Sequence, residues 1–329
     1  MKHAKLLFCV VCLLMSAFAV HAQTAVVAPP RARLQLLDQA PAGSVGYLLV
    51  DMPRLLGSPL AQSLRQGMPV PVDVQKLDQF VLFVLPGAEG GPPEVSGLVK
   101  GTETIREDVA QFLTGQATTV EGMAAYALDH AAGPGESPML VVADDTTLLF
   151  GSTQASLAKG IVAFRGQARD DLKAARQLAS PYLREPIQGA FVLTDDLKAQ
   201  AQADPNAPAW LAGTKGVALG VSMPAGLSIN GLLELADAAT AVQVAAQGAE
   251  GLNGVKAQMA QPSNFMAMMF QPFRPLIDNA RIYGEGATVR LATQLSEAEL
   301  TAMVAALQQM QQGMMQGGMA PGAPMPPQQ

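Results

Sequence analysis

One order of strands and helices occurs twice in this chain, and this repetition constrains the fold more than any other feature of the sequence. The segments "GYLLVD" (46–51) and "GAFVLTDD" (189–196) each contain a glycine, a short apolar run typical of a strand, and an aspartate able to cap a following helix. The segments "QFVLFVLPG" (79–87) and "GVALGVSMPAG" (216–226) follow in the same order. Both predict a strand that ends at a proline-containing turn.

Two more pairs of segments continue the repetition. Residues 94–113 and 227–246 each predict a strand with a central glycine, followed by a helix. Residues 139–164 and 280–307 each predict a hairpin followed by a helix with an i, i+4, i+7 apolar stripe. Any α+β chain yields some such pairs by chance, but the shared order favours an internal duplication.

The repeated order is strand–helix–strand–strand–helix–strand with an added strand and a C-terminal helix, which has a ferredoxin-like βαββαβ flavour. We therefore predict an α+β fold of two tandem related domains, each a mostly antiparallel sheet with helices on one face. The expected organisation is a signal peptide at 1–22, a flexible N-terminal segment at 23–34, a first α+β domain at 35–168, a second α+β domain at 169–312, and a disordered Met/Gln/Gly/Pro tail at 313–329.

The N-terminus has the features of a secretory signal peptide. Lys2 and Lys5 precede an apolar run at residues 6–20, and the small residues Val20 and Ala22 fit a cleavage site after Ala22. The alternative is an uncleaved N-terminal anchor. We expect an exported protein, periplasmic or extracellular, with no transmembrane segment after cleavage because no later apolar run is long enough to span a bilayer.

Cleavage narrows the possible chemistry. It removes Cys9 and Cys12, the only cysteines, so the mature chain forms neither a disulfide nor a thiolate metal site. The whole chain has 21 basic and 27 acidic residues, a formal net charge of −6, with its lysines and arginines scattered. Nucleic-acid binding needs a clustered basic face, so we expect no nucleic-acid partner.

Candidate catalytic residues are few. His130 is the only histidine after cleavage, and it lies in a loop rich in glycine and proline with no partner fixed by spacing. The adjacent carboxylates at 144–145, 170–171 and 195–196 fit turns and helix caps. No nucleotide-binding glycine loop is recognised. We assign no catalytic, cofactor-binding or metal-binding residue and predict a non-enzymatic protein without a cofactor.

The candidate binding residues are apolar. Met266, Met268, Met269 and Phe270 in "NFMAMMFQPF" cannot all face inward on one short helix, and methionine side chains suit an adaptable binding surface. The alternative is that they belong to an ordinary core. We interpret them as a candidate apolar patch for a lipid, a peptide or a protein partner; the sequence leaves the oligomeric state open.

The methionines of the C-terminal tail allow a second interpretation. Thioethers bind copper(I), and Met310, Met314, Met315 and Met319 have suitable spacing, with Met303 able to join them. The tail offers no histidine or cysteine, and its Gln/Gly/Pro composition is typical of disorder. We expect a disordered tail rather than a metal site.

The sequence therefore predicts an exported, non-enzymatic α+β protein with a binding or structural role in the cell envelope. One alternative is a periplasmic carrier of an apolar ligand. Another is a hydrolase whose site is not recognisable from its residues. The fold pattern alone does not separate them, because one fold hosts many functions.

Overall fold

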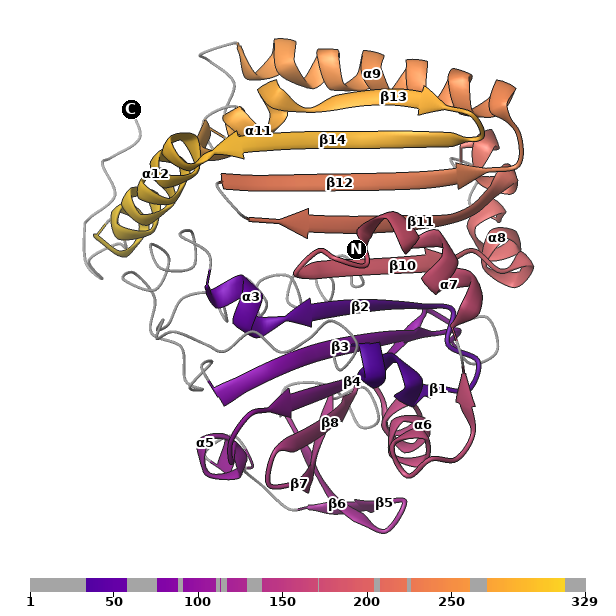
Figure 1. The fold of residues 1–329 in the computed structure, drawn as a ribbon, viewed down its shortest axis with the longest axis vertical. Coiled ribbons are helices and arrows are strands. Elements are labelled where there is room, and N and C mark those ends of the chain that lie inside the picture. The colour runs from indigo at the N-terminus through magenta and orange to yellow at the C-terminus, as the bar shows by residue number, and fades with distance from the viewer. Residues whose placement is uncertain are drawn as a thin grey trace, which may run out of the picture.

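The computed structural model describes residues 34–57, 76–87, 91–110, 113, 117–128, 138–170, 172–203, 208–223, 226–260 and 271–316. The chain is α+β: within these ranges it forms a 12-stranded sheet and a separate two-stranded ribbon, and all their strand pairs are antiparallel (Figure 1). The elements before residue 169 are η1 (Leu34–Gln39), β1 (Ala40–Pro41), β2 (Gly46–Asp51), α3 (Met52–Leu56), β3 (Leu77–Leu85), β4 (Glu94–Gly101), α5 (Arg106–Ala110), β5 (Thr118–Val120), β6 (Met123–Ala127), β7 (Met139–Asp144), β8 (Thr147–Gly151) and α6 (Gln154–Phe164). The later elements are β9 (Arg169–Asp170), α7 (Lys173–Leu178), η4 (Ser180–Tyr182), β10 (Ile187–Val192), α8 (Asp195–Gln202), η5 (Ala209–Gly213), β11 (Thr214–Ser222), β12 (Gly226–Leu235), α9 (Ala238–Met259), η6 (Gln271–Phe273), α11 (Arg274–Asn279), β13 (Arg281–Glu285), β14 (Thr288–Ser296) and α12 (Glu297–Gln316).

The strand order of the large sheet is symmetrical about its middle. The order is β13-β14-β12-β11-β10-β2-β3-β4-β8-β7-β6-β5. Strands β2 and β10 pair at the centre, with Val50 opposite Ile187. From there β2-β3-β4-β8-β7 runs outward in one direction and β10-β11-β12-β14-β13 in the other, as Figure 1 shows. The strands of the repeated segments therefore take matching positions in the strand order, the first set before residue 169 and the second after it.

Three details differ from the expectation. The halves share one continuous sheet instead of forming two sheets, because β2 and β10 would each be an apolar free edge if they did not pair. Helices cover both faces of the sheet rather than one, because the central strands carry apolar residues on both faces. The ferredoxin-like pairing is not confirmed, since β2 and β3, like β10 and β11, are direct antiparallel neighbours, whereas a split βαβ unit has another strand between them.

The two faces of the sheet are covered by different helices. Face A carries the largest core cluster, in which Leu157 and Ile161 of α6 and Leu178 of α7 pack on strand residues such as Phe83. Helices α6 and α7 lie in front of the sheet in Figure 1. Face B carries three smaller clusters, built with α3 and α12, with α9, and with α5. None of the described helices is both long and apolar enough to cross a membrane.

The last helix of each half packs on a different face. Helix α6 follows β8 and begins at a capping box between Thr153 and Ser156. Helix α12 follows β14, and Ser296 and Glu299, whose spacing in the sequence predicts a capping box, form one at its start. Ser296 N donates to Glu299 Oε2 at 2.8 Å, and Glu299 N donates to Ser296 Oγ at 3.3 Å. Yet α6 packs on face A, whereas α12 packs on face B through Met303. Face A is therefore left more open over the outer strands of the second half.

A row of residues crosses face B in matching order in both halves. The two central glycines of the repeated segments, Gly97 of β4 and Gly231 of β12, each lie on the third strand from the β2–β10 boundary. Each glycine pairs with a large apolar residue on the next strand, Phe150 or Leu291. Counting outward from the boundary, the row is Leu48, Leu82, Gly97 and Phe150 in the first half and Gly189, Leu219, Gly231 and Leu291 in the second.

A β-bulge also recurs at the same place in each half. In β3 the register shifts between Leu77 and Gln79, where Gln79 pairs with Lys100 of β4. In β11 the register shifts between Thr214 and Gly216, where Gly216 pairs with Glu234 of β12. A bulge leaves one residue outside the regular pairing and redirects its side chain. These extra residues are Asp78 in the first half and Lys215 in the second.

Candidate functional site

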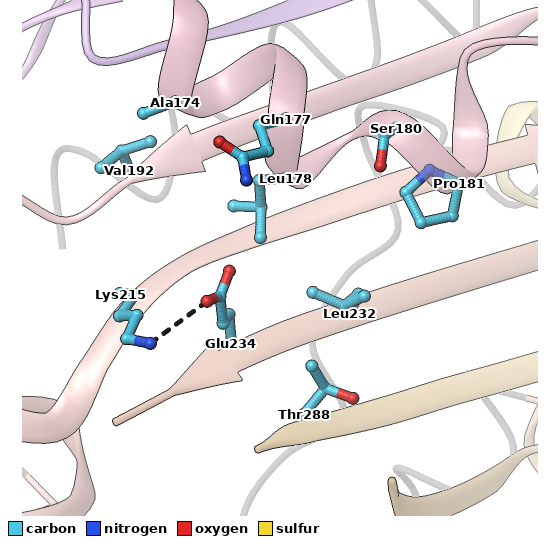
Figure 2. A pocket seen from close by; sticks show the side chains of 10 residues that line it. All are labelled: Ala174, Gln177, Leu178, Ser180, Pro181, Val192, Lys215, Leu232, Glu234 and Thr288. Atoms are coloured by element: carbon cyan, nitrogen blue, oxygen red, sulfur yellow. Dashed lines mark hydrogen bonds and ion pairs between the residues drawn. The ribbon is translucent and has the colours of Figure 1, made fainter. Parts of the chain in front are cut away.

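A pocket lies on face A of the second half, between α7 with η4 and the strands β11, β12 and β14. Figure 2 shows Gln177 and Leu178 extending from α7 toward Glu234 on β12. The cavity volume is about 440 Å³, a size typical of small-molecule sites. The lining residues are Ala174, Gln177, Leu178, Ser180, Pro181, Val192, Lys215, Leu232, Glu234 and Thr288.

Two glycines of β11 let the upper wall of the pocket approach the sheet. A Cβ atom added to Gly216 would lie 2.7 Å from Leu178 Cδ2, and one added to Gly220 would lie 2.7 Å from Tyr182 Cδ1. Any larger residue at either position would push α7 or η4 away from the strand. The two glycines of "GVALGVS" therefore determine how closely α7 and η4 approach β11, and with that the depth of the pocket.

The charged part of the pocket is one ion pair. Lys215 Nζ lies 3.3 Å from Glu234 Oε1, and the two side chains are 54% and 36% exposed (Figure 2). The bulge in β11 brings Lys215 out of regular register and beside Glu234. Gln177 and Ser180 are exposed, and their side chains make no hydrogen bond within the described residues, so both remain available to a ligand.

The opposite face of β11 is unusual. Its small residues Gly216, Ala218 and Gly220 are buried under α7 and η4 on face A, whereas Val217 and Leu219 on face B are 39% and 36% exposed. Leu291 of β14 is 39% exposed on the same face, across Gly231 from Leu219. We call Val217, Leu219, Gly231 and Leu291 the open patch. Exposed apolar residues that cluster in this way mark interaction sites more often than isolated ones do.

Two buried tyrosines lie near the pocket in contrasting surroundings. Burial raises the pKa of Tyr47 to about 12, against the smaller opposing effect of the Arg176 charge. Its hydroxyl has no hydrogen-bond partner among the described residues. Burial also raises the pKa of Tyr182, but Arg290 donates a hydrogen bond to that hydroxyl. Tyr47 is thus the less satisfied of the two.

The residues singled out from the sequence fall largely outside these sites. Met266, Met268, Met269, Phe270 and His130 lie outside the described residues. The expected turn role of Asp144 is confirmed, because its carboxylate accepts a hydrogen bond from Thr146 N at 2.8 Å between β7 and β8.

The C-terminal methionines are partly placed by the structure. Met303 is 8% exposed and packs in a face B cluster, so it is committed to the core and does not extend the tail's set of thioethers. Helix α12 continues to Gln316, past residue 313 where the tail was expected to begin. A single glycine costs a helix only about 1 kcal/mol, and the surrounding methionines and glutamines favour it. Met319 lies outside the described residues.

Sequence reasoning missed Lys215, Glu234 and the open patch. The signal that could have found the patch is the alternation in "GVALGVS", where small residues share one face and larger apolar residues share the other. The ion pair was not predictable in this way, because it depends on a bulge. Within the described ranges, no group of three or more His, Cys, Asp or Glu side chains is placed to hold a metal ion.

No protein-family model matches the chain, and no curated protein matches it. Among solved structures, crystal form I of TP0453 is 11% identical, with a TM-score of 0.40 and coverage of 87% of this chain and 99% of that chain. Crystal form III of TP0453 is 10% identical, with a TM-score of 0.41 and coverage of 86% and 99%. Because both TM-scores are below 0.5, this likeness supports no statement about function.

Proposed function

We propose that the protein is exported and non-enzymatic, and that it acts in the cell envelope by binding an apolar ligand, a lipid or a peptide, on face B. The observation that carries this proposal is the inverted burial of β11, which covers its glycines and alanine and leaves Val217 and Leu219 exposed. A strand that served only the core would bury its larger apolar residues, since each contributes about 1.5–3 kcal/mol on burial.

The open patch has neighbours that support a binding role. Across the β2–β10 boundary, the same row continues through half-buried Leu48 to buried Leu82, so the exposed residues lie at the end of a row of apolar residues that leads into the core. Polar side chains are absent from the four residues of the patch. Such a surface favours an apolar ligand over a charged one, because a charged group placed there would lose its hydration without gaining a partner.

Native mass spectrometry of the protein purified from its own host tests this function. The expected result is a retained lipid or peptide, with its mass separating the two. The variants Leu219→Thr and Leu291→Thr keep strand-forming residues while reducing the apolar area, and each should lower the retained fraction roughly tenfold. Leu183→Thr is the matched control, since Leu183 is 38% exposed but lies outside the patch.

A bare protein, or equal retention by the patch variants and the control, would contradict the proposal. Retention that falls equally in all three variants would also contradict it, because it would indicate a general effect of lost apolar surface. Circular dichroism spectra of all three variants should match that of the unmodified protein.

We also propose that the two halves arose by internal duplication. The shared strand order, the matched glycines of the face B row and the matched bulges support this proposal. Superposing β2-β3-β4-β8-β7 on β10-β11-β12-β14-β13 in an experimental structure tests it. If Gly97 and Gly231, or the two bulges, do not coincide after superposition, the repetition is convergent.

A further inference from the structure

We propose that the pocket between α7 and β11 binds a small zwitterion, namely an α-amino acid with an aliphatic side chain. The pocket lies on face A, whereas the open patch lies on face B, so this site is separate from the one proposed above. The proposal rests on three features of the pocket lining: two adjacent opposite charges, two amide or hydroxyl groups without partners, and an aliphatic wall.

The two charges of the pocket match the two charges of the ligand. Lys215 Nζ and Glu234 Oε1 are 3.3 Å apart. In an α-amino acid the ammonium and carboxylate groups are separated by a single carbon atom. Such a ligand places its carboxylate on Lys215 and its ammonium on Glu234 at the same time, forming two charge-assisted hydrogen bonds in place of one exposed ion pair. Separating that pair costs little, because exposed pairs contribute only about 0–1 kcal/mol.

The rest of the lining fits the uncharged part of the ligand. Leu178, Val192 and Leu232 provide aliphatic surface from three different elements. Gln177 and Ser180 lie on the opposite wall and offer donors and acceptors without partners among the described residues (Figure 2). Aliphatic surface beside a few polar groups is the usual composition of a small-molecule site.

Other ligand classes fit less well. Lys215 is the only cation among the described residues that line the pocket, and a phosphate group is usually held by several cations or by backbone N–H groups. A dicarboxylate would place its second charge against Glu234. The described part of the lining contains no aromatic side chain and so offers no stacking surface for a flat ring.

The matching place in the first half shows what a purely structural arrangement looks like. There, Lys100 occupies the position of Glu234 and Thr147 that of Thr288. Lys100 Nζ donates to the hydroxyls of Thr146 and Thr147, both at 2.7 Å, and lies 3.8 Å from Asp144 Oδ1. Two hydrogen bonds and one ion pair thus hold its ammonium group within the protein. Glu234 has one ion-pair contact among the described residues and faces an open cavity.

Isothermal titration calorimetry with L-leucine tests the site on the full-length protein. The expected result is saturable binding at one site with Kd below about 1 mM. Three analogues separate the contributions: 4-methylpentanoate lacks the ammonium, 3-methylbutylamine lacks the carboxylate, and glycine lacks the aliphatic side chain. Each should bind roughly tenfold more weakly than L-leucine or not at all, because each loses a charge-assisted bond or the apolar contact.

Variants locate the binding in the pocket. Lys215→Met and Glu234→Gln should each weaken L-leucine binding roughly tenfold. Lys100→Met is the matched control, since it removes a lysine at the equivalent end of the first half, and it should leave binding unchanged. Leu219→Thr should also leave it unchanged, which distinguishes this site from the open patch.

The proposal is overturned if L-leucine does not bind. It is also overturned if the single-charge analogues bind as tightly as L-leucine, or if Lys215→Met and Glu234→Gln bind it as tightly as Lys100→Met does. Both pocket side chains are more than a third exposed, so these variants are expected to fold, and equal melting temperatures would verify that.

Discussion

The two halves of the sheet have the same strand order, but side chains and helices cover their faces differently. In the first half Phe150 covers Gly97 and stacks on Phe80, with ring centroids 5.6 Å apart and an interplanar angle of 6°. In the second half the matching Gly231 has, among the described residues, only Leu291 within contact of an added Cβ, and Leu291 and Leu219 stay exposed. The same contrast holds on face A, where α6 packs in the first half and α12 does not pack in the second.

This difference separates two roles within one architecture. In the first half, aromatic side chains cover face B and the last helix, α6, covers face A. Both contacts bury apolar surface and so favour stability. The second half leaves one apolar patch and one charged pocket accessible, and both proposed sites lie there. Because the second half is the less closed of the two, it is the better place to look for a ligand.

The sharpest test of this contrast is the pair of variants Gly97→Ala and Gly231→Ala. At Gly97 the new Cβ would lie 1.9 Å from the Phe150 ring, so the stacked ring must move, and we expect a loss of about 2–3 kcal/mol in the free energy of unfolding. At Gly231 the nearest atom would be 3.5 Å away, an ordinary contact, and we expect a change within about 0.5 kcal/mol. Urea unfolding measures both, and equal losses would show that the two rows are equally closed.

The two buried tyrosines extend the comparison to alkaline pH. Because the native pKa of Tyr47 is raised from 10.0 to about 12, its contribution to stability is full below pH 10 and is lost as the pH rises toward 12. By pH 12 this loss amounts to about 2 kcal/mol. Tyr47→Phe should abolish that part of the alkaline decline, measured as the difference between variant and unmodified protein in denaturant unfolding at pH 8 and pH 12.

At neutral pH the same two tyrosines should respond in opposite directions. Tyr47→Phe removes a hydroxyl without a described partner, so the free energy of unfolding should stay equal or rise. Tyr182→Phe removes the acceptor of the Arg290 hydrogen bond and should lower it by about 1 kcal/mol. A loss of that size for Tyr47→Phe would mean that its hydroxyl has a bound partner in solution.

The smallest expected effect on stability comes from replacing the lysine at the corresponding edge of each half, Lys100 or Lys215. Lys100→Met breaks contacts to two threonine hydroxyls and an aspartate and should cost about 1 kcal/mol. Lys215→Met removes one exposed ion pair and should cost less than about 0.5 kcal/mol. Thermal unfolding at low and high salt checks both values. A larger cost for Lys215→Met would make its ion pair structural and weaken the case for a ligand.

Much of the secondary structure was predictable from the sequence. Short apolar runs predicted the strands β2, β3, β10 and β11, and the capping-box spacing of Ser296 and Glu299 indicated the start of α12. The pairing between β2 and β10 was not predictable, because nothing in the sequence of either strand indicates its neighbour. The pairing places Val50 opposite Ile187, and most of the first half lies between these two residues in the sequence. The face of the sheet on which each helix packs also depends on such distant contacts.

The candidate sites were less predictable than the fold. The open patch arises from two strands whose exposed residues meet across Gly231, and the pocket arises from a bulge that redirects Lys215. Neither local propensity nor hydrophobic periodicity predicts which residues of different strands come into contact, or where a bulge occurs. The predicted methionine patch at residues 266–270 stays a prediction, since it lies outside the described residues.

The central pairing of β2 with β10 also has a consequence for how the chain folds as it is synthesised. When the first half has emerged, β2 presents the uncharged edge Gly46–Val50, and its partner does not exist until residue 192 has been added. An uncharged strand edge is a template for pairing with other chains. Contacts this distant in sequence also form slowly. The interval before β10 arrives is therefore when this protein most needs a chaperone, and it is also the period in which two nascent copies would be most prone to join through β2.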